Sequence, residues 1–234
     1  MKYEETRVAI VTGAGTGIGL AIAQTLAKSS HAIVVVDINR ARAEDLAANL
    51  RHSGSSALAI HADLSQRQDA EGIIATTLEQ YGHVDVLVNN AGIMDGFTPL
   101  LDMDEALLSR VMGVNLEGAL WASRAALRAM LERGRGVIVN IASIGGFAGG
   151  RAGTAYTVSK HALIGLTRSV AWQYGPQGVR FELHQPWSAL LLDDEKVIHE
   201  STPIQPLNPA LPSWRDTLVL TFRHGGFQGP QETA

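Results

Sequence analysis

The stretch Val8–Gly19 reads VAIVTGAGTGIG, and it decides the fold of this chain. A short run of β-branched and small apolar residues ends at Thr12, which is typical of a strand buried on both faces. Alternate positions from Gly13 to Gly19 are glycines, and an amphipathic segment, Gly17–Lys28, begins within them. A strand, a glycine turn and a helix in this order predict the first unit of a parallel α/β sheet.

Strand-like and helix-like segments alternate from this stretch as far as residue 180. The predicted strands are Arg7–Thr12, Ala32–Asp37, Ala57–His61, Val84–Asn89 and Val137–Ala142. The predicted helices are Gly17–Lys28, Arg40–Arg51, Gln66–Tyr81, Met103–Leu131 and Tyr156–Tyr174. This alternation predicts one Rossmann-like domain, a doubly wound parallel sheet with helices on both faces.

Composition excludes several classes of protein. The 234 residues carry a formal net charge of −4 and no Lys/Arg block, so nothing favours binding to nucleic acid or to an anionic membrane. There are no cysteines, which excludes disulfides and thiolate sites, and the eight histidines show no metal-ligand spacing. No apolar run is long enough to be a signal peptide or a membrane span, so we expect a cytoplasmic protein without a metal.

The glycine turn has a functional interpretation beside the structural one. Glycines let the backbone approach a pyrophosphate closely, and a helix N-terminus favours its negative charge. The residues predicted to bind a dinucleotide here are Gly13, Thr16, Gly17, Ile18 and Gly19. A tight strand–helix turn also uses glycine, so the pattern alone leaves a purely structural role open.

Asp37 ends the second predicted strand, about 20 residues beyond the glycine turn. A carboxylate at this point can accept hydrogen bonds from both hydroxyls of an adenosine ribose and repels a 2′-phosphate, which favours NAD over NADP. Arg40 nearby keeps NADP open, and a helix N-cap is the structural alternative for Asp37.

Tyr156 and Lys160 are one helical turn apart, so their side chains are expected on the same helix face. Ser143 follows the strand Val137–Ala142, and ligands of open α/β sheets bind at the carboxyl ends of the strands. An ammonium group and a positive nicotinamide would favour the phenolate of a tyrosine, whose pKa in water is near 10. The three residues form a candidate acid/base site, although a solvated Tyr and Lys would share this spacing.

Residues 7–180 resemble the short-chain dehydrogenase/reductase family, in its common single-domain NAD(P)-binding branch. The resemblance rests on the following motifs: the glycine turn Thr12–Gly19, the segment Asn89–Gly92, Asn115 within Val114–Gly118, and Ser143 with Tyr156 and Lys160. It covers about three quarters of the chain. It implies a homodimer or homotetramer that acts on a small-molecule alcohol or ketone.

The resemblance implies a catalytic role for four residues. Tyr156 would exchange a proton with the substrate hydroxyl or carbonyl, and Ser143 would bind the same oxygen. Lys160 would bind the nicotinamide ribose and lower the pKa of Tyr156. Asn115 would hold a water on the path of the proton.

The resemblance also extends the cofactor site beyond the glycine turn. Asp63 would lie near the adenine ring. Asn89, Ala91 and Gly92 would line the floor of the cofactor site and stabilise the central sheet. Together with Asp37, Tyr156 and Lys160, these residues complete the expected cofactor contacts.

The sequence changes character after Arg180, where the family continues with a strand that ends in Pro-Gly. Six of the eight prolines follow Phe181, and Pro-Gly is absent from this turn. If every codon of 181–187 is shifted forward by one base, the allowed residues include Leu-Asn-Cys-Ile-Ser-Pro-Gly, the expected family segment. We therefore hypothesise that the reading frame is lost near residue 180, in the gene or in its recorded sequence; a genuinely divergent tail is the alternative.

The sequence thus predicts a Rossmann domain over residues 1–183 and an atypical proline-rich segment over 184–234. The predicted function is hydride transfer between NAD(H) and a secondary alcohol or ketone. Apolar residues near the site, Ile93, Met94, Ile144 and Phe147, favour a small apolar or cyclic substrate. One alternative is a catalytically impaired NAD-binding protein without a working substrate lid. Another is an extended-branch sugar-nucleotide epimerase, which the Asn89–Gly92 segment and the short chain disfavour.

Overall fold

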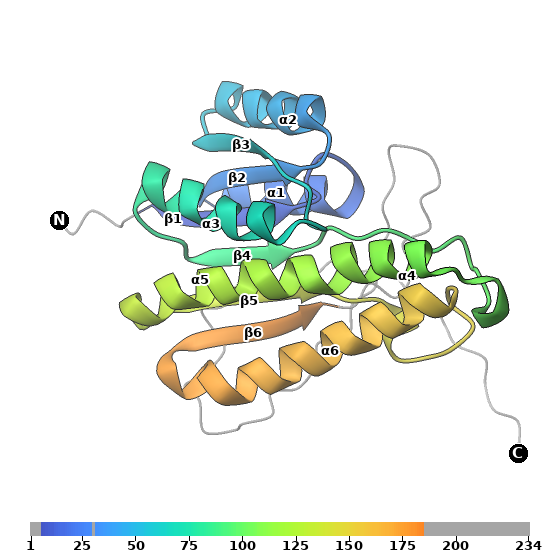
Figure 1. The fold of residues 1–234 in the computed structure, drawn as a ribbon. Helices are drawn as coiled ribbons and strands as arrows, with labels where there is room; N and C mark the ends of the chain where they lie inside the picture. Colours follow the sequence, from blue (N-terminus) through green and yellow to red (C-terminus); the bar gives the residue numbers. More distant parts are fainter. Residues whose placement is uncertain (1–5, 30, 185–234) are drawn as a thin grey trace, which may run out of the picture.

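The computed structural model describes residues 6–29 and 31–184, which form a parallel sheet with helices on both faces (Figure 1). The six strands are β1 (Arg7–Thr12), β2 (His31–Asp37), β3 (Ala57–His61), β4 (Val86–Asn89), β5 (Gly136–Ile141) and β6 (Val179–His184). Their order is β3-β2-β1-β4-β5-β6, so the chain reverses direction across the sheet between β1 and β4. The predicted doubly wound Rossmann-like fold is confirmed.

Two apolar layers hold the helices on the sheet, because successive side chains of a strand point to opposite faces. On one face, α1 (Gly17–Lys28) and α2 (Arg40–His52) pack over β1 and β2. On the other face lie α3 (Arg67–Tyr81), α5 (Ala119–Arg133) and α6 (Thr154–Tyr174), the last two beside β5 and β6 (Figure 1). Strands covered in this way read as continuous Val and Ile runs, as β2 does.

The predicted helix Met103–Leu131 differs from the observed one in its ends and in its middle. It begins at Glu105, because the Asp104 carboxylate accepts a hydrogen bond from the Leu107 N–H and caps α4 (Glu105–Met112). A π-helical stretch, Gly113–Gly118, then joins α4 to α5. Gly118 packs against Leu64: a Cβ at Gly118 would lie 2.6 Å from the Leu64 carbonyl oxygen. The periodicity of the sequence could not reveal this wider turn, because its contacts come from another part of the chain.

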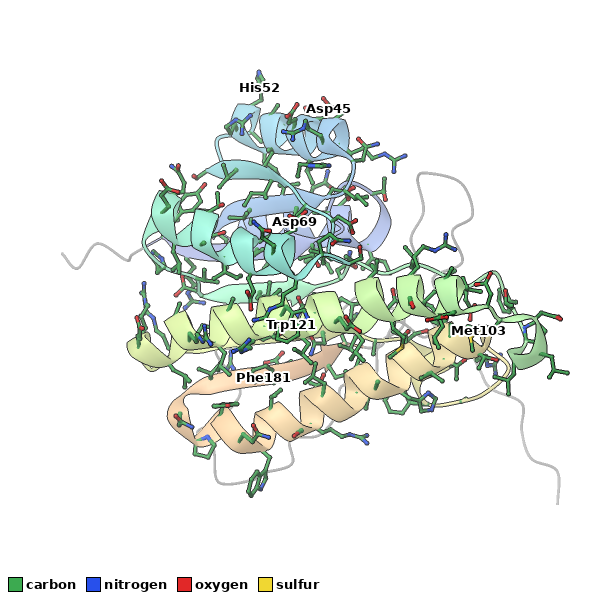
Figure 2. All side chains as sticks on the ribbon, in the orientation of Figure 1. Asp45, His52, Asp69, Met103, Trp121 and Phe181 are labelled. Atoms are coloured by element: carbon green, nitrogen blue, oxygen red, sulfur yellow. The ribbon has the colours of Figure 1, made fainter. Side chains whose placement is uncertain are left out.

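The sheet contains one strand, β6, in addition to the five that were predicted. It pairs in parallel with β5, from Gly136 opposite Val179 to Ile141 opposite His184. Phe181 faces the layer that contains α5 and α6 and packs against its core (Figure 2). Residues 185–234 lie outside the described residues, and with them nearly all of the predicted atypical segment 184–234 and the last three of the seven shifted codons.

Candidate active site

The glycine turn between β1 and α1 is built against the segment that follows β4. The Asn90 Nδ2 group donates to the Thr12 and Gly13 carbonyl oxygens at 2.9 and 3.1 Å. A Cβ at Gly13 would lie 2.9 Å from the Ala91 Cα, and a Cβ at Gly19 would overlap the Gly13 carbonyl oxygen. These glycines therefore permit close packing of backbone on backbone, in addition to any contact with a ligand.

The N-terminus of α1 fits a pyrophosphate. Its N-cap is Thr16, whose side chain makes no capping hydrogen bond among the described residues. Gly17, the first helical residue, has φ +56°, and a Cβ there would meet no described atom within 4 Å. Open space beside uncapped helix N–H groups suits an anion, which supports the predicted roles of Gly17, Ile18 and Gly19.

Asp37 lies at the carboxyl end of β2, beside the glycine turn. One carboxylate oxygen accepts a hydrogen bond from the Gly15 N–H at 2.8 Å, and the other accepts one from the Asn39 N–H at 2.8 Å. The N-cap of α2 is Asn39, because its side chain accepts a hydrogen bond from the Arg42 N–H. The structural alternative for Asp37 is therefore excluded, and its half-buried carboxylate is held where the turn and β2 meet.

Two further predicted cofactor residues, Asn89 and Asp63, differ in where their side chains lie. Asn89 points into the interior, where its Nδ2 group donates to Asn140 Oδ1 at 2.8 Å and to Ser123 Oγ at 2.9 Å. Its side chain thus stabilises the sheet. Asp63 follows β3 and accepts from the Ser65 N–H and hydroxyl, so it sits at the same edge as Asp37. Its predicted contact with adenine stays a prediction.

Ser143, Tyr156 and Lys160 come together at the carboxyl end of β5. The Tyr156 ring and the Ser143 hydroxyl both lie beside Gly145, where a Cβ would be 3.5 Å from the ring and 3.6 Å from Ser143 Oγ. The Ser143 Oγ accepts from the Gly145 N–H at 3.1 Å. The Lys160 ammonium donates to the Ile141 carbonyl oxygen at 2.8 Å and lies 5.7 Å from the centre of the Tyr156 ring. It also lies close to Gly92, where a Cβ would be 3.5 Å from Nζ. The structure therefore brings the predicted acid/base group together.

Burial sets the protonation of this group in the chain on its own. Burial lowers the pKa of Lys160 to about 8. For Tyr156, burial raises the pKa, the Ser143 hydrogen bond lowers it, and the negative charge of Asp95 raises it again; the net direction is upward. The predicted lowering of the Tyr156 pKa by Lys160 together with a positive nicotinamide stays a prediction.

Asn115 lies in the π-helical stretch and is almost fully buried. Its Oδ1 accepts from the Ile93 N–H at 2.8 Å, and its Nδ2 donates to the Ile93 carbonyl oxygen and to Ser159 Oγ. Both Nδ2 protons are thus used within the protein, so the amide fixes the segment after Gly92 to the helix. Its predicted part in holding a water stays a prediction.

Three residues important to the site were not predicted as site residues. Asn90 holds the glycine turn, Ser159 joins Asn115 to α6, and Asp95 caps α6. Only Asn90 carried a signal in the sequence, as a member of the Asn89–Gly92 segment. The other two act through contacts between distant parts of the chain.

Comparison with known proteins agrees with this geometry. The family model for short chain dehydrogenases matches residues 7–188. The chain belongs to the short chain dehydrogenase family. The resemblance found in the sequence is thereby confirmed, and the match extends over β6.

Several relatives share about two fifths of their aligned residues with this chain. 3beta-hydroxysteroid dehydrogenase 2 of Eggerthella lenta is 38% identical over 175 residues, which are 74% of this chain and 67% of that protein. 2-(S)-hydroxypropyl-CoM dehydrogenase 3 of Xanthobacter autotrophicus is 39% identical over 176 residues, 75% and 69% of the two chains. The solved structure of an NAD⁺-bound xylitol dehydrogenase has a TM-score of 0.75 and 34% identity, and the match covers 80% of this chain and 72% of that one.

Within residues 6–29 and 31–184, no three His, Asp or Glu side chains are grouped in a way that could hold a metal ion. None of the described helices is both long and apolar enough to cross a membrane.

Proposed function

We propose that this short chain dehydrogenase transfers a hydride between NAD(H) and a secondary alcohol or ketone. The observation that carries the proposal is the convergence of Ser143, Tyr156 and Lys160 at the carboxyl end of β5. When bound, the nicotinamide accepts or donates the hydride. Tyr156 gives or takes the proton of the substrate oxygen, and Ser143 orients that oxygen by a second hydrogen bond.

The preference for NAD rests on Asp37. Its carboxylate is fixed by the Gly15 and Asn39 N–H groups beside the glycine turn, where the adenosine ribose of a dinucleotide would lie. A fixed negative charge accepts ribose hydroxyls and repels a 2′-phosphate. The NAD⁺-bound state of the xylitol dehydrogenase neighbour supports the same preference.

The proposed substrate is small and apolar or cyclic. Met94 follows Ile93, which binds Asn115, and Phe147 lies four residues after Ser143. The two side chains are 48% and 43% exposed, so they offer apolar surface on the segments that carry the site. A hydroxysteroid dehydrogenase among the relatives also favours a cyclic secondary alcohol. A cytoplasmic location and a homodimer or homotetramer stay predictions.

Replacement of Tyr156 by Phe tests the proposed reaction. The variant should lose about two to four orders of magnitude in kcat with a cyclic alcohol such as cyclohexanol, because proton transfer to a positioned phenol is lost. NADH affinity, measured by the fluorescence of the bound cofactor, should change by less than about threefold, because the phenol acts on the substrate. Tyr174→Phe, at the far end of α6, is the matched control and should keep its kcat. Retention of more than a few per cent of kcat in Tyr156→Phe, in an active protein, would contradict the mechanism.

A second candidate is a family member that binds NAD but is catalytically impaired, and Glu182 favours it. Phe181 faces α5 and α6, so Glu182 points to the opposite face of β6. Its Oε1 makes no hydrogen bond among the described residues but forms an ion pair with Arg180 Nε at 3.7 Å. Burial raises the pKa of its carboxyl group and Arg180 lowers it; the net direction is upward. Burial therefore disfavours the charged acid at this position, and the shifted reading frame would place Asn or Ser there.

Expression of the chain as written beside a variant with the frame restored after Arg180 separates the two candidates. The restored variant should resist proteolysis and turn over cyclic or secondary alcohols with NAD⁺. The chain as written should show little or no turnover while still binding NADH. Normal activity and a protease-resistant C-terminal region in the chain as written would instead identify the divergent tail as a working part of the enzyme.

A further inference from the structure

The helix that carries Tyr156 begins without a cap of its own. The N-cap of α6 is Gly153, which has no side chain to accept a hydrogen bond from the first turn. The first N–H groups of a helix have no partner inside the helix and need acceptors from elsewhere. Because α6 also supplies Lys160, the way in which these groups are satisfied affects the whole acid/base site.

Asp95, in the segment after β4, supplies the missing acceptors from 58 and 61 residues away. One carboxylate oxygen accepts from the Gly153 N–H at 3.0 Å, and the other accepts from the Tyr156 N–H at 2.9 Å. The side chain is 3% exposed, so these bonds are shielded from water. Charge-assisted bonds of this kind are stronger than neutral ones.

The turn around Asp95 is shaped for this contact. The Thr98 carbonyl oxygen accepts from the Thr154 N–H at 3.0 Å, which satisfies a further group of the first turn. Phe97 has φ +59°, a left-handed conformation that is costly for a residue other than glycine, and its N–H also donates to the Asp95 carboxylate. A Cβ at Gly153 would lie 2.5 Å from Asp95 Oδ2, so only glycine lets the turn approach so closely.

We propose that Asp95 is a positioning residue for Tyr156, which caps α6 from the segment after β4 and holds the phenol against Ser143. The catalytic meaning of this role rests on the proposed function. The structural part, that Asp95 fixes the first turn of α6, stands on the hydrogen bonds alone. Asp95 bonds to the Tyr156 backbone and affects the substrate only through the position of Tyr156.

The charge of Asp95 gives a readout that packing alone would not move. Three polar or charged groups act on the phenol among the described residues: Ser143 from β5, Lys160 from α6 and Asp95 from the segment after β4. Asp95 is the negative one, and it raises the pKa of Tyr156. Removal of this charge should therefore lower the pKa of Tyr156.

The variant Asp95→Asn keeps the shape and removes the charge. An amide offers one acceptor oxygen, so its NH₂ group must face the N–H of either Gly153 or Tyr156. We expect the hydrogen exchange of these amides in the full chain to become about tenfold faster or more, while amides in the middle of α6 stay protected. Gly153→Ala, which inserts a methyl group beneath the carboxylate, should have the same effect and serves if Asp95→Asn does not fold.

The titration of the Tyr156 phenol, followed by ultraviolet difference absorbance with Tyr156→Phe subtracted, gives the second readout. In Asp95→Asn the midpoint should move to lower pH by about half a unit. In active protein the rising limb of kcat for alcohol oxidation should move in the same direction, and kcat should fall about tenfold with KM changed less than about twofold.

Matched controls separate capping in general from capping of α6. Asp104→Asn removes the exposed N-cap carboxylate of α4, and Gly149→Ala adds a methyl group where no described atom lies within 4 Å of it. Both should leave the exchange at Tyr156 and its titration unchanged. Unchanged exchange in Asp95→Asn and in Gly153→Ala, or an unchanged titration in Asp95→Asn, would overturn the proposal. These two readouts need neither cofactor nor turnover, so they decide the role of Asp95 even in a chain that fails the test of the proposed function.

Discussion

Helices α1 and α6 begin at the same edge of the sheet, yet they differ in whether the protein supplies hydrogen-bond acceptors for their first N–H groups. At α1, Thr16 makes no capping hydrogen bond among the described residues, and Gly17 leaves open space beside it. At α6, the carboxylate of Asp95 and the carbonyl oxygen of Thr98 satisfy the first turn. Both helix ends attract negative charge. The proposed function assigns the first end to the negative charge of a cofactor, and the protein itself fills the second.

This difference separates binding from catalysis. An open helix end can exchange its anion, which suits a cofactor that must enter and leave. A helix end filled by a buried side chain is fixed, which suits Tyr156 and Lys160, because a misplaced acid/base group loses much of its effect. Changes at α1 should therefore act on affinity and folding, and changes at α6 on the acid/base chemistry.

The largest effect is expected at α1, from Gly19→Ala. Alanine is the better helix former, but its Cβ would overlap the backbone of Gly13, which cannot move without opening the glycine turn. We expect loss of NADH binding and a free energy of unfolding reduced by about 2 kcal/mol or more, measured by denaturant titration. Gly72→Ala in α3, where a Cβ meets no described atom within 4 Å, is the matched control and should stabilise the protein slightly. Unimpaired stability and binding in Gly19→Ala would show that the turn is looser than its contacts indicate.

The next effect concerns the charge buried on α6, at Lys160. Its pKa is about 8 in the folded protein against 10.5 for a free lysine, so between these values the unfolded chain binds more protons and stability rises with pH. Relative to Lys160→Met, the protein should gain stability from about pH 8 to about pH 10, by at most about 3 kcal/mol.

Denaturant titrations across this pH range measure the gain. Lys28→Met, at the exposed end of α1, is the matched control. Parallel stability curves for the protein and for Lys160→Met would show that the Lys160 ammonium is not penalised by burial.

The smallest effect is expected at the open end again, from Asp37→Ala. This change removes the carboxylate that would accept the ribose hydroxyls and repel a 2′-phosphate, so the ratio of NADH to NADPH affinity should fall by about tenfold. Titration of cofactor fluorescence measures both affinities. Asp45→Ala, on the outer side of α2 (Figure 2), should leave the ratio unchanged. Equal affinities in the unaltered protein would contradict the assignment of Asp37 at the outset.

The parts of the site that the sequence predicted are those whose residues lie close together along the chain. The pair Tyr156 and Lys160 is set by one turn of helix, and the glycine turn by seven consecutive residues, so both were predicted correctly as neighbours. Asp95 reads in the sequence as a residue of a turn, and nothing near it indicates that it caps a helix 58 residues later. The π-helical stretch around Asn115 was missed for the same reason, since its side chain bonds to Ile93.

The sequence by itself determined the alternation of strands and helices, the order of the motifs and the residues at the strand ends. Each of these depends on local spacing and on which residues a buried strand or a tight turn accepts. Only the tertiary structure decided that α1 begins open and α6 begins filled, that Asn89 serves the sheet, and that burial acts on Tyr156 and Lys160 in opposite directions. Hydrogen bonds across the fold and the loss of water around a charge depend on which distant segments meet, and local spacing carries no information on that.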